Sequence, residues 1–435
     1  MRILLIEATR TAPVSRFYPH LGLRYLAAFA SRYADFELEF LIVAVSEFPK
    51  LSQRPDLVGI SAVTGNFATA ERIAVSAREQ LGHHVPILLG GCHVSALASS
   101  LPAPFDAGVI GEGEATFLEL LARLKARGTL TESDYASIPG LAYRNQSGVA
   151  RSGPRPLLTE LDRIPFPVQR TPVFGIAHVI TSRGCPYPCA YCAARSLWGQ
   201  VRNHSPRYVV EELQNLVGQA GVDQVIFFDD NFLADRKRIR EIAEELEVHG
   251  LAGRVGFICF GRTRGIQPDL AADLARMGVQ EIYLGADTAA DQLNERRRSP
   301  GVFQRNQRAV DLCADTGMKV DCSFVVGLPH QTPEDLDQVL DFVVHNRPRL
   351  KSIQISPVNL FPGTPLWDYA VKKGRISRDK VDWSALESFT RIQDFSLDRY
   401  LYLNERMRPE VFADYCKRFA AVVATPEAGA AHPVW

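Results

Sequence analysis

The chain has 435 residues, 46% of them hydrophobic, which is typical of a protein with two or three folded domains. Its 49 Lys and Arg residues equal its 49 Asp and Glu residues in number, so no general basic surface for nucleic acid is expected. Charged residues interrupt each apolar run, and neither a transmembrane helix nor a membrane partner is predicted. Eight cysteines in a chain of this length do not indicate a disulfide framework.

Residues 1–127 alternate short apolar runs with helical patterns. The runs are residues 3–6, 38–43, 57–61, 86–90 and 108–110. Between two of them, Ile73, Ala77 and Leu81 share one face of a predicted helix. This alternation predicts a parallel sheet with helices on both faces, a Rossmann-like α/β domain that binds ligands at the carboxyl ends of its strands.

Glycines and small polar residues follow three of these runs. The candidate ligand-binding residues are Thr64, Gly65, Gly90, Gly91, Cys92, His93, Gly111, Glu112 and Gly113. Glycine lets a ligand approach the backbone closely. An ordinary turn explains any single glycine as well, but the joint pattern favours a ligand site. For His93, packing within the loop is an equally good explanation.

Residues 128–175 separate this domain from the next. The segment Asn145-Gln146-Ser147-Gly148 is a turn signal between two extended runs and predicts a hairpin. Five prolines between residues 154 and 172 then predict a stiff connector. We expect a domain boundary in this stretch.

Three cysteines lie within eight residues at C-x-x-x-C-x-x-C spacing: Cys185, Cys189 and Cys192. They follow the apolar run 177–180, and a neighbouring glycine and two prolines place them on a loop. Thiolates suit iron–sulfur clusters and zinc, but structural zinc takes four protein ligands and no fourth is nearby. The spacing therefore predicts a 4Fe–4S cluster with one iron left open, and a degenerate zinc site is the alternative.

Residues 176–370 repeat a strand-then-helix unit six times. Six units predict an open, partial (β/α)6 barrel with its chemistry at the carboxyl ends of the strands. The candidate side chains at those ends are Asp229, Asp230, Arg262, Asp287 and Gly327. Adjacent carboxylates are costly to bury without a cation or donors, although capping of the next helix is an alternative role for them. For Arg262, a solvated loop position is nearly as good an explanation.

Residues 371–435 predict a small helical C-terminal region. Phe412, Tyr415 and Phe419 recur there at helical spacing. Such a region either closes the open barrel over a substrate or only covers apolar surface, and the two roles are equally compatible with the pattern.

The cysteine pattern, with Tyr191 directly before the last cysteine, resembles the signature of the radical S-adenosylmethionine (radical SAM) family. Residues 1–127 resemble the cobalamin-binding domain that precedes many radical SAM domains. The matching segments are His20–Ala27, Pro55–Ser61, Gly90–His93 and Gly111–Thr116. The Asp-x-His-x-x-Gly motif that supplies an axial histidine in other cobalamin proteins is absent, so the lower ligand of the cobalt is not identified.

This resemblance implies three cofactors: a 4Fe–4S cluster, S-adenosylmethionine (SAM) and cobalamin. It places the backbone of Tyr191 beside the adenine, and it gives Asp229 or Asp230 the ammonium group of SAM. Arg262 is expected to pair with the SAM carboxylate. Asp287 stands where relatives carry a glutamate, and is expected to bind the ribose hydroxyls or the ammonium group.

By the same resemblance, the protein cleaves SAM reductively to a 5′-deoxyadenosyl radical and methylates an unactivated carbon of a small natural product. An external donor such as a flavodoxin or ferredoxin supplies the electron, and the oxygen-sensitive cluster predicts a cytoplasmic location. A ring rearrangement, cyclisation or sulfur insertion without methyl transfer is the nearest alternative. Methylthiolation of transfer RNA is disfavoured because no extra N-terminal cysteines or basic C-terminal domain are visible. A non-catalytic cobalamin sensor is disfavoured by the intact three-cysteine loop.

Overall fold

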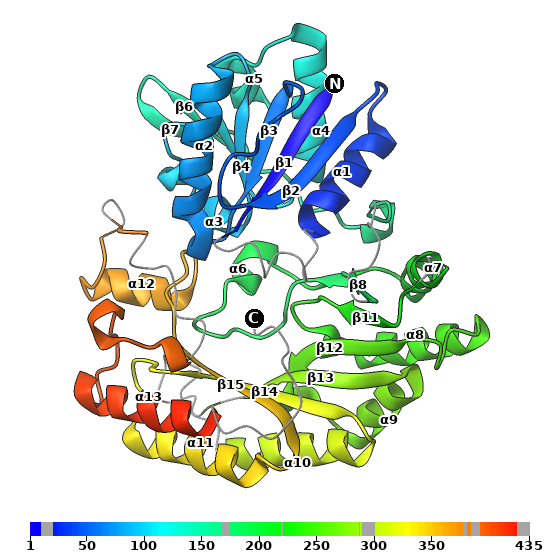
Figure 1. Cartoon of the computed structure of the whole chain (residues 1–435), viewed down its shortest axis with the longest axis vertical. Coiled ribbons are helices and arrows are strands. Elements are labelled where there is room, and N and C mark those ends of the chain that lie inside the picture. The colour runs from blue at the N-terminus through cyan, green and yellow to red at the C-terminus, as the bar shows by residue number, and fades with distance from the viewer. Residues whose placement is uncertain are drawn as a thin grey trace. The chain divides into compact units, whose positions relative to one another are not determined.

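The computed structural model describes residues 1–9, 21–167, 175–218, 221–286, 288, 301–377, 381–383 and 392–423. They form two compact units (Figure 1). The N-terminal unit holds the described residues up to 167, together with residues 361–363 and 381–383. The C-terminal unit holds the others. Within the described residues, no helix combines the length and the apolar character needed to span a membrane.

The N-terminal unit is built on a seven-stranded sheet of order β2-β1-β3-β4-β5-β6-β7. Its strands are β1 (Arg2–Ala8), β2 (Glu39–Val45), β3 (Leu57–Ser61), β4 (Ile87–Gly90), β5 (Ala107–Val109), β6 (Leu141–Asn145) and β7 (Gly148–Arg151). Its helices are α1 (Leu21–Tyr33), α2 (Phe67–Leu81), α3 (Cys92–Ala96), α4 (Glu114–Arg127) and α5 (Glu132–Ser137). The strands from β1 to β5 are parallel. The predicted hairpin forms as β6 and β7, but it extends this sheet instead of lying in the connector.

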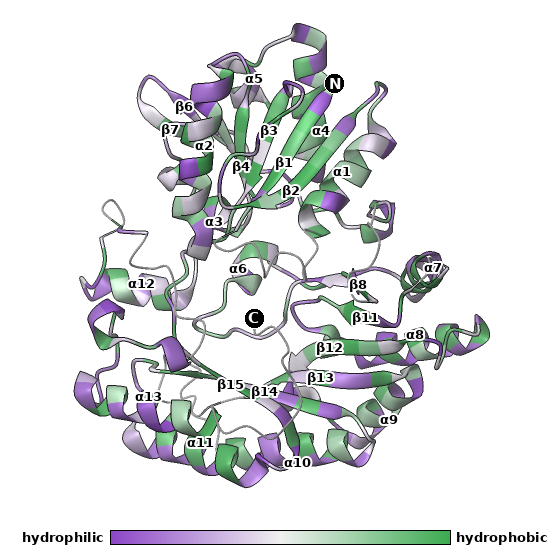
Figure 2. Ribbon diagram, viewed as in Figure 1, coloured by the Kyte–Doolittle hydropathy of each residue, from purple (hydrophilic) through white to green (hydrophobic). Residues whose placement is uncertain are grey.

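Helices cover both faces of this sheet, as predicted. Leu4, Ile6 and Ile60 belong to a core on the α2 side, whereas Ile3 and Leu5 belong to a second core on the α1 and α4 side. Successive residues of a strand point to opposite faces, so one apolar strand supplies both cores, and Figure 2 shows the hydrophobic character of these central strands. The strand order reverses between β1 and β3, which is where sheets of this type bind ligands.

The C-terminal unit is built on a six-stranded, wholly parallel sheet of order β15-β14-β13-β12-β11-β8, the predicted open barrel. Its strands are β8 (Ile176–Val179), β11 (Gln224–Phe227), β12 (Gly256–Arg262), β13 (Val279–Gly285), β14 (Lys319–Val326) and β15 (Leu350–Pro357). Its helices are α6 (Ala194–Trp198), α7 (Pro206–Val217), α8 (Arg236–Val248), α9 (Pro268–Met277), α10 (Val302–Asp315), α11 (Pro333–Asn346), α12 (Pro365–Lys372) and α13 (Pro409–Val423). A short pair, β9 (Ser182–Arg183) and β10 (Arg202–Asn203), lies beside the cysteine loop.

Local capping fixes where several of these helices begin. The side chains of Ser205, Asp235 and Thr332 accept hydrogen bonds from the backbone three residues later, at the starts of α7, α8 and α11. A proline at the first turn of α7 and α11 supports the same boundary. Asp235 therefore caps α8. Capping this helix was the alternative role for the two carboxylates at the end of β11, and Asp235 fills it in their place.

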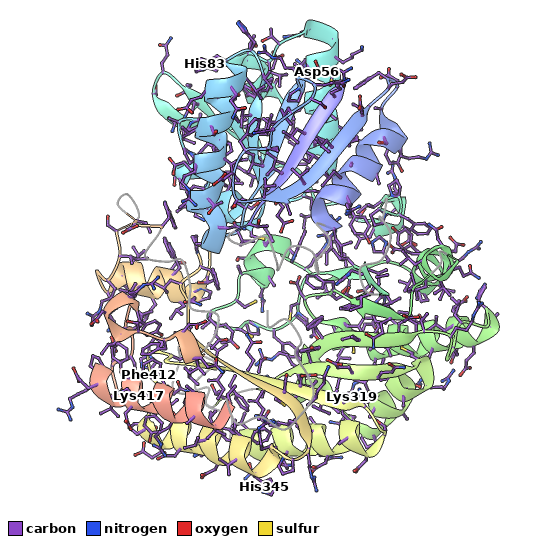
Figure 3. The ribbon with its side chains drawn as sticks, viewed as in Figure 1. Asp56, His83, Lys319, His345, Phe412 and Lys417 are labelled. Carbon is purple, nitrogen blue, oxygen red and sulfur yellow. The ribbon has the colours of Figure 1, made fainter. Side chains whose placement is uncertain are left out.

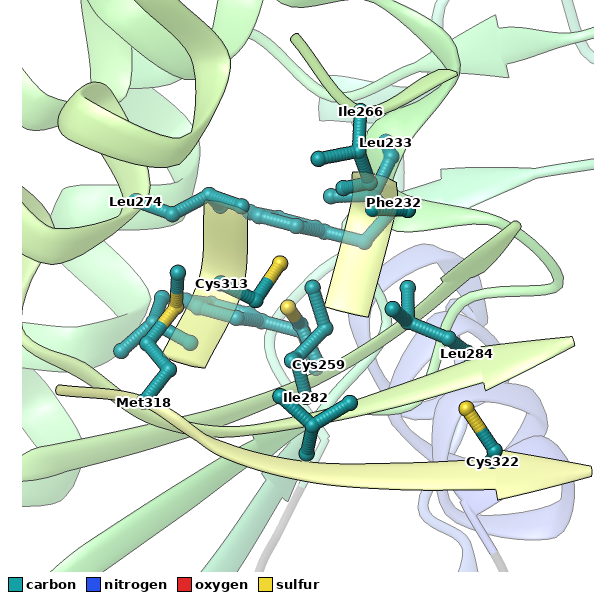
Figure 4. Close-up of a cluster of buried hydrophobic side chains, with 14 of the residues drawn as sticks. Phe232, Leu233, Cys259, Ile266, Leu274, Ile282, Leu284, Cys313, Met318 and Cys322 are labelled. Carbon is teal, nitrogen blue, oxygen red and sulfur yellow. The ribbon is translucent and has the colours of Figure 1, made fainter. Parts of the chain in front are cut away.

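Helices α7 to α11 pack one face of the barrel sheet into a continuous core. Cys259, Cys313 and Cys322 lie fully buried within it (Figure 4). Burial raises the pKa of the Cys313 thiol to about 12. These cysteines therefore serve as small hydrophobic residues. On α13, Phe412 is buried and Lys417 exposed, so this helix also presents one apolar face (Figure 3).

Candidate cofactor sites

The three cysteines lie on the loop that follows β8. Gly184 begins it with φ of 97°, and a Cβ there would lie 2.7 Å from the carbonyl oxygen of Gln200, so glycine is required. Cys185 is partly exposed, Cys189 buried and Cys192 exposed. The loop is fixed at its far end, where the N–H of Leu366 donates to the carbonyl of Ala190 at 2.9 Å.

Asp229 and Asp230, at the end of β11, have different surroundings. Asp229 is 4% exposed, and it accepts hydrogen bonds of 2.6 Å from the N–H and hydroxyl of Thr181 and from the hydroxyl of Ser182. Burial nevertheless raises the pKa of its carboxyl, against the lowering effect of the nearby Arg238. Asp229 thus fixes the segment that leads into the cysteine loop, and three hydrogen bonds already use its oxygens.

Asp230 is the carboxylate left accessible at this strand end. It is exposed and accepts hydrogen bonds from the N–H of Gly184, at 3.1 Å, and from the side chain of Trp198. The bond from Gly184 places it beside the first residue of the cysteine loop.

Arg262 ends β12 and reaches the cysteine loop. Its guanidinium donates to the sulfur of Cys189 and lies over the ring of Tyr187, at 5.3 Å from the centroid. A neighbouring cation favours the thiolate form that ligates metals. The predicted alternative, a solvated loop arginine, is therefore wrong. In the described part of the chain, no three His, Cys, Asp or Glu side chains are gathered closely enough to hold a single metal ion.

Gly327 ends β14 with φ of 87°. A Cβ there would lie 2.8 Å from the ring of Phe412 and from the hydroxyl of Tyr400, so close packing by the C-terminal segment requires glycine. The side chain of Asn404 donates to the carbonyls of Leu328 and Gln331, at 2.6 and 2.7 Å, and ties the same segment to the turn. This anchor could not be read from the sequence because 73 residues separate Asn404 from Gln331.

Of the remaining candidates in this unit, Tyr191 is half-buried in the turn directly before Cys192. Asp287 lies outside the described residues.

The N-terminal unit has its own set of turns at the carboxyl ends of its strands. Asn66 links the ends of β1 and β3, because its side chain donates to the carbonyl of Ala8 at 2.5 Å and accepts from the N–H of Val63 at 2.8 Å. Val63 is 50% exposed beside Gly65, whereas Thr64 is buried. Asn66 was not predicted from the sequence, although its place just before a helix was a visible signal.

The turn after β4 is closely packed. Gly91 has φ of 101°, and a Cβ would lie 2.3 Å from the carbonyl oxygen of Ala62, which also donates its N–H to the carbonyl of Gly90. Cys92, the next residue, is exposed. This geometry explains the Gly90-Gly91 pair and leaves Cys92 accessible at the edge.

His93 lies inside the unit. It is 0% exposed, and its ring nitrogens lie 3.1 Å from the hydroxyl of Thr64 and 3.0 Å from that of Ser100. Its ring stacks on Phe67 at 3.8 Å, and Trp383 meets it edge-on at 4.5 Å. Burial lowers the pKa of His93 to about 3. His93 is therefore packed inside the unit with Thr64 as one of its partners, as the packing explanation predicted.

The third glycine turn also has internal partners. The N–H of Gly111, which has φ of 73°, donates to the hydroxyl of Ser95 at 2.9 Å. Glu112 is 8% exposed and accepts a hydrogen bond of 2.8 Å from the N–H of Leu158, so it holds the connector. Gly113 precedes α4, and a Cβ there would lie 3.3 Å from Leu26. Of these three residues, Gly111 has open space around the position of a Cβ, so its backbone is accessible to a ligand, as predicted for glycine here.

Comparison with known protein families matches both units. The model of the Radical SAM superfamily matches residues 179–343, and the model of the B12 binding domain matches residues 9–121. The chain is a radical SAM enzyme with a B12-binding domain.

Relatives of this radical SAM enzyme align along most of its length. An uncharacterized methyltransferase of Pyrococcus horikoshii is 28% identical over 94% of this chain and 94% of its own. The anaerobic magnesium-protoporphyrin IX monomethyl ester cyclase of Rubrivivax gelatinosus is 27% identical over 78% of this chain and 64% of its own.

Solved structures share the fold. The radical SAM methyltransferase TsrM of Kitasatospora setae, in one structure with cobalamin and a [4Fe-4S] cluster and in another with tryptophan and a SAM analogue, superposes with TM-scores of 0.68 and 0.69. These alignments are 20% identical and cover 86% of this chain and 75% and 76% of the TsrM chains. Likeness at this identity shows a shared architecture.

The cofactors of this radical SAM enzyme are a 4Fe–4S cluster, SAM and cobalamin. The residues present fit the cluster, because three thiols share one loop and a guanidinium bonds the sulfur of Cys189. They also fit a corrin, because the turns at the carboxyl ends of the strands contain glycines, which let a ligand approach the backbone. Val63 and Cys92 in these turns are exposed.

Proposed function

We propose that this radical SAM enzyme methylates an unactivated carbon of a small organic molecule, with a cobalamin-borne methyl group. One observation supports it most directly: the chain joins the three-cysteine loop, with Arg262 at Cys189, to a B12-binding unit whose strand ends are lined by glycine turns. The methyltransferase names of the Pyrococcus relative and of TsrM support the outcome. The tryptophan in the TsrM structure supports a small-molecule substrate.

When bound, these groups supply reductive cleavage of SAM to a 5′-deoxyadenosyl radical, hydrogen abstraction from the substrate, and a transferable methyl group. The chain's own residues bind and orient them. Cys185, Cys189 and Cys192 ligate the cluster, and Arg262 stabilises the thiolate of Cys189. Asp230 accepts hydrogen bonds from the ammonium group of SAM, since its carboxylate is exposed beside the loop.

The reducing electron comes from an external protein such as a flavodoxin or ferredoxin, and the reaction takes place in the cytoplasm, where cluster-bearing proteins are kept reduced. Neither nucleic acid nor a membrane is needed as a partner.

A second candidate is a cobalamin-dependent cyclisation without methyl transfer. The cyclase of Rubrivivax gelatinosus, 27% identical to this chain, favours it.

The test is an anaerobic assay of the reconstituted enzyme with a strong reductant, SAM deuterated at its methyl group, and metabolite extracts of the source cells. We expect 5′-deoxyadenosine, S-adenosylhomocysteine and a product that carries the deuterated methyl group. Deoxyadenosine with neither of the other products would favour cyclisation. Absence of deoxyadenosine would overturn the proposal.

A further inference from the structure

Arg262 lies where a strand of the barrel meets the cysteine loop. It is the last residue of β12, and its partner across the sheet is Gly285, the last residue of β13. A Cβ at Gly285 would lie 3.8 Å from Cγ of Arg262, so the stem of the arginine lies beside the end of the next strand. The side chain therefore starts from a paired position of the sheet.

The backbone that follows Arg262 is also anchored. Thr263 is buried, and its hydroxyl donates to the side-chain oxygen of Asn306 at 2.7 Å. Asn306 is itself buried on α10. Strand pairing before the arginine and this bond after it fix the point from which the guanidinium reaches the loop.

Two contacts hold the guanidinium at one of the three cysteines. It donates to the sulfur of Cys189, and it lies over the ring of Tyr187, 5.3 Å from the centroid. Cys189 is 9% exposed, so salt and water screen the contact less than they would at the surface. Since arginine is not deprotonated in proteins, a permanent positive charge lies at a ligand sulfur of the cluster.

The carboxylates of the same region make other contacts. Asp230 bonds to the N–H of Gly184 at 3.1 Å and is exposed, so its charge is the more strongly screened. Asp229 is buried and accepts from the hydroxyls of Thr181 and Ser182. These bonds hold the carboxylates at backbone and hydroxyl groups, whereas the guanidinium bonds a ligand sulfur itself.

Reduction adds one negative charge to the cluster. An external donor gives up one electron, and the 4Fe–4S cluster with its thiolates takes up that electron. A positive charge or a hydrogen bond at a ligand sulfur stabilises the reduced form more than the oxidised form. A guanidinium fixed at Cys189 therefore favours reduction.

We propose that Arg262 raises the reduction potential of the cluster and so eases its reduction by the external donor. Arg262 acts through Cys189, so it tunes and positions this ligand and is not itself a catalytic residue. The inference goes beyond the proposed function, because the cluster is reduced before any substrate reacts, whatever the radical does next.

The test is a redox titration of the anaerobically reconstituted enzyme without SAM. The electron paramagnetic resonance signal of the reduced cluster is followed and scaled to the iron content of each variant. We expect Arg262→Gln to lower the equilibrium constant for one-electron reduction about tenfold, which is a midpoint potential ~59 mV more negative. Arg262→Lys keeps a positive charge and should lie closer to the wild type. Tyr187→Leu removes the ring that holds the guanidinium and should shift the midpoint in the same direction as Arg262→Gln, by less.

The matched control is Arg264→Gln, which removes an exposed arginine from the turn directly after β12. It should leave the midpoint unchanged. The inference is overturned if Arg262→Gln titrates like the wild type, or if Arg264→Gln shifts the midpoint as much. It is also overturned if Arg262→Gln weakens SAM binding, measured by calorimetry, without moving the midpoint, since the guanidinium would then serve the SAM carboxylate.

A second variant covers the case in which Arg262→Gln assembles no cluster. Tyr187→Leu then decides, because it keeps the guanidinium and all three thiols, and a wild-type midpoint in this variant overturns the inference. The titration uses neither SAM nor substrate, so its outcome is independent of methyl transfer, which the assay with deuterated SAM tests.

Discussion

Two adjacent carboxylates at the end of β11 have separate tasks. Asp229 is enclosed by donors from Thr181 and Ser182, whereas Asp230 is exposed and accepts from Gly184. Removing an acceptor from buried donors costs about 1–3 kcal/mol, so Asp229 contributes chiefly to the stability of the loop. Removing an accessible carboxylate costs affinity for a cationic group instead.

We therefore expect Asp230→Asn to weaken SAM binding about tenfold or more, with an unchanged melting temperature and iron content. Asp229→Asn should lower the free energy of unfolding by about 1–3 kcal/mol and reduce the iron bound per chain. Calorimetric titration of the reconstituted enzyme with SAM, thermal melts and iron analysis separate the two. If Asp229→Asn lowers SAM affinity while stability and iron content stay unchanged, this assignment is reversed.

The sequence was sufficient to predict the cysteine loop, because the spacing of three ligands on one loop is a local feature of the chain. It did not distinguish Asp229 from Asp230, since the direction of two successive residues depends on where β11 ends in its pairing with β8 and β12. It also left the role of His93 open. One of its partners, Thr64, lies 29 residues away and only the fold brings the two together.

Asp321 should make stability depend on pH. Its pKa is raised to about 7 by burial, so the folded chain keeps a proton that the unfolded chain loses near pH ~4. The folded state then binds more protons than the unfolded state between these values, so the free energy of unfolding falls as pH rises from about 4 to about 7 and is constant above that. Burial raises the pKa of Glu281, but the hydrogen bonds from Lys351, Tyr283 and Asp321 and the charge of Lys351 together lower it by more, so its own effect lies at lower pH.

We expect the free energy of unfolding of the wild-type protein, measured by urea titration, to fall between about pH 4 and pH 7 by on the order of 1 kcal/mol per pH unit, and to level off above pH 7. Asp321→Asn, which is neutral throughout, should flatten this dependence. A slope that persists in Asp321→Asn would assign the titration to another group.

At the scale of single elements, the C-terminal segment holds the turn after β14 in place through Asn404. The side chain of Asn404 donates to two carbonyls of that turn and accepts from the N–H groups of Arg406 and Met407, at 2.8 and 2.9 Å. It thus orders both the turn that begins at Gly327 and the segment itself. The sequence predicted a C-terminal region that covers the barrel, but not this contact.

We expect Asn404→Ala to lower the free energy of unfolding by about 2–3 kcal/mol, because several buried backbone groups lose their partner. Hydrogen exchange of residues 327–332 should accelerate in parallel. Asn215→Ala, at an exposed position of α7, is the control and should change neither quantity. If hydrogen exchange of residues 327–332 is unchanged in Asn404→Ala, the core contacts of Phe412 hold the turn without the Asn404 side chain.

The turn after β4 provides a corresponding test in the N-terminal unit. Gly91→Ala forces a Cβ against the carbonyl of Ala62, in addition to the strain of a left-handed residue. Gly82 has φ of 69° with open space around it, so Gly82→Ala carries the backbone strain without the collision. We expect Gly82→Ala to lose about 1–2 kcal/mol of stability and Gly91→Ala to lose more because of the collision. Gly91→Ala alone should lose bound cobalamin, measured by the corrin absorbance. Equal cobalamin content in the two variants would remove this turn from the cofactor edge.

At the scale of the whole molecule, the order of a ligand-binding α/β domain before a partial barrel was predictable, since each rests on local periodicity. By contrast, the sequence did not predict that residues 361–363 and 381–383 belong to the N-terminal unit. Trp383 packs on His93 and Phe67 there, although the sequence separates it from them by the whole barrel. Single apolar residues in a polar stretch carry no periodic signal that would reveal such a contact.

The N-terminal unit has two cores of its own, and its glycine turns are held by residues of the same unit. Its capacity to bind cobalamin should therefore survive the loss of the cluster. We expect the variant Cys185→Ala/Cys189→Ala/Cys192→Ala, purified from corrin-supplemented cells, to contain cobalamin at the wild-type level, no iron above background, and no activity in forming deoxyadenosine. Cys322→Ala removes a core thiol instead and should keep its iron and its cobalamin with reduced stability. Loss of cobalamin together with iron in the triple variant would show that the two sites depend on each other for folding, and iron retained by the triple variant would remove the three cysteines from the cluster.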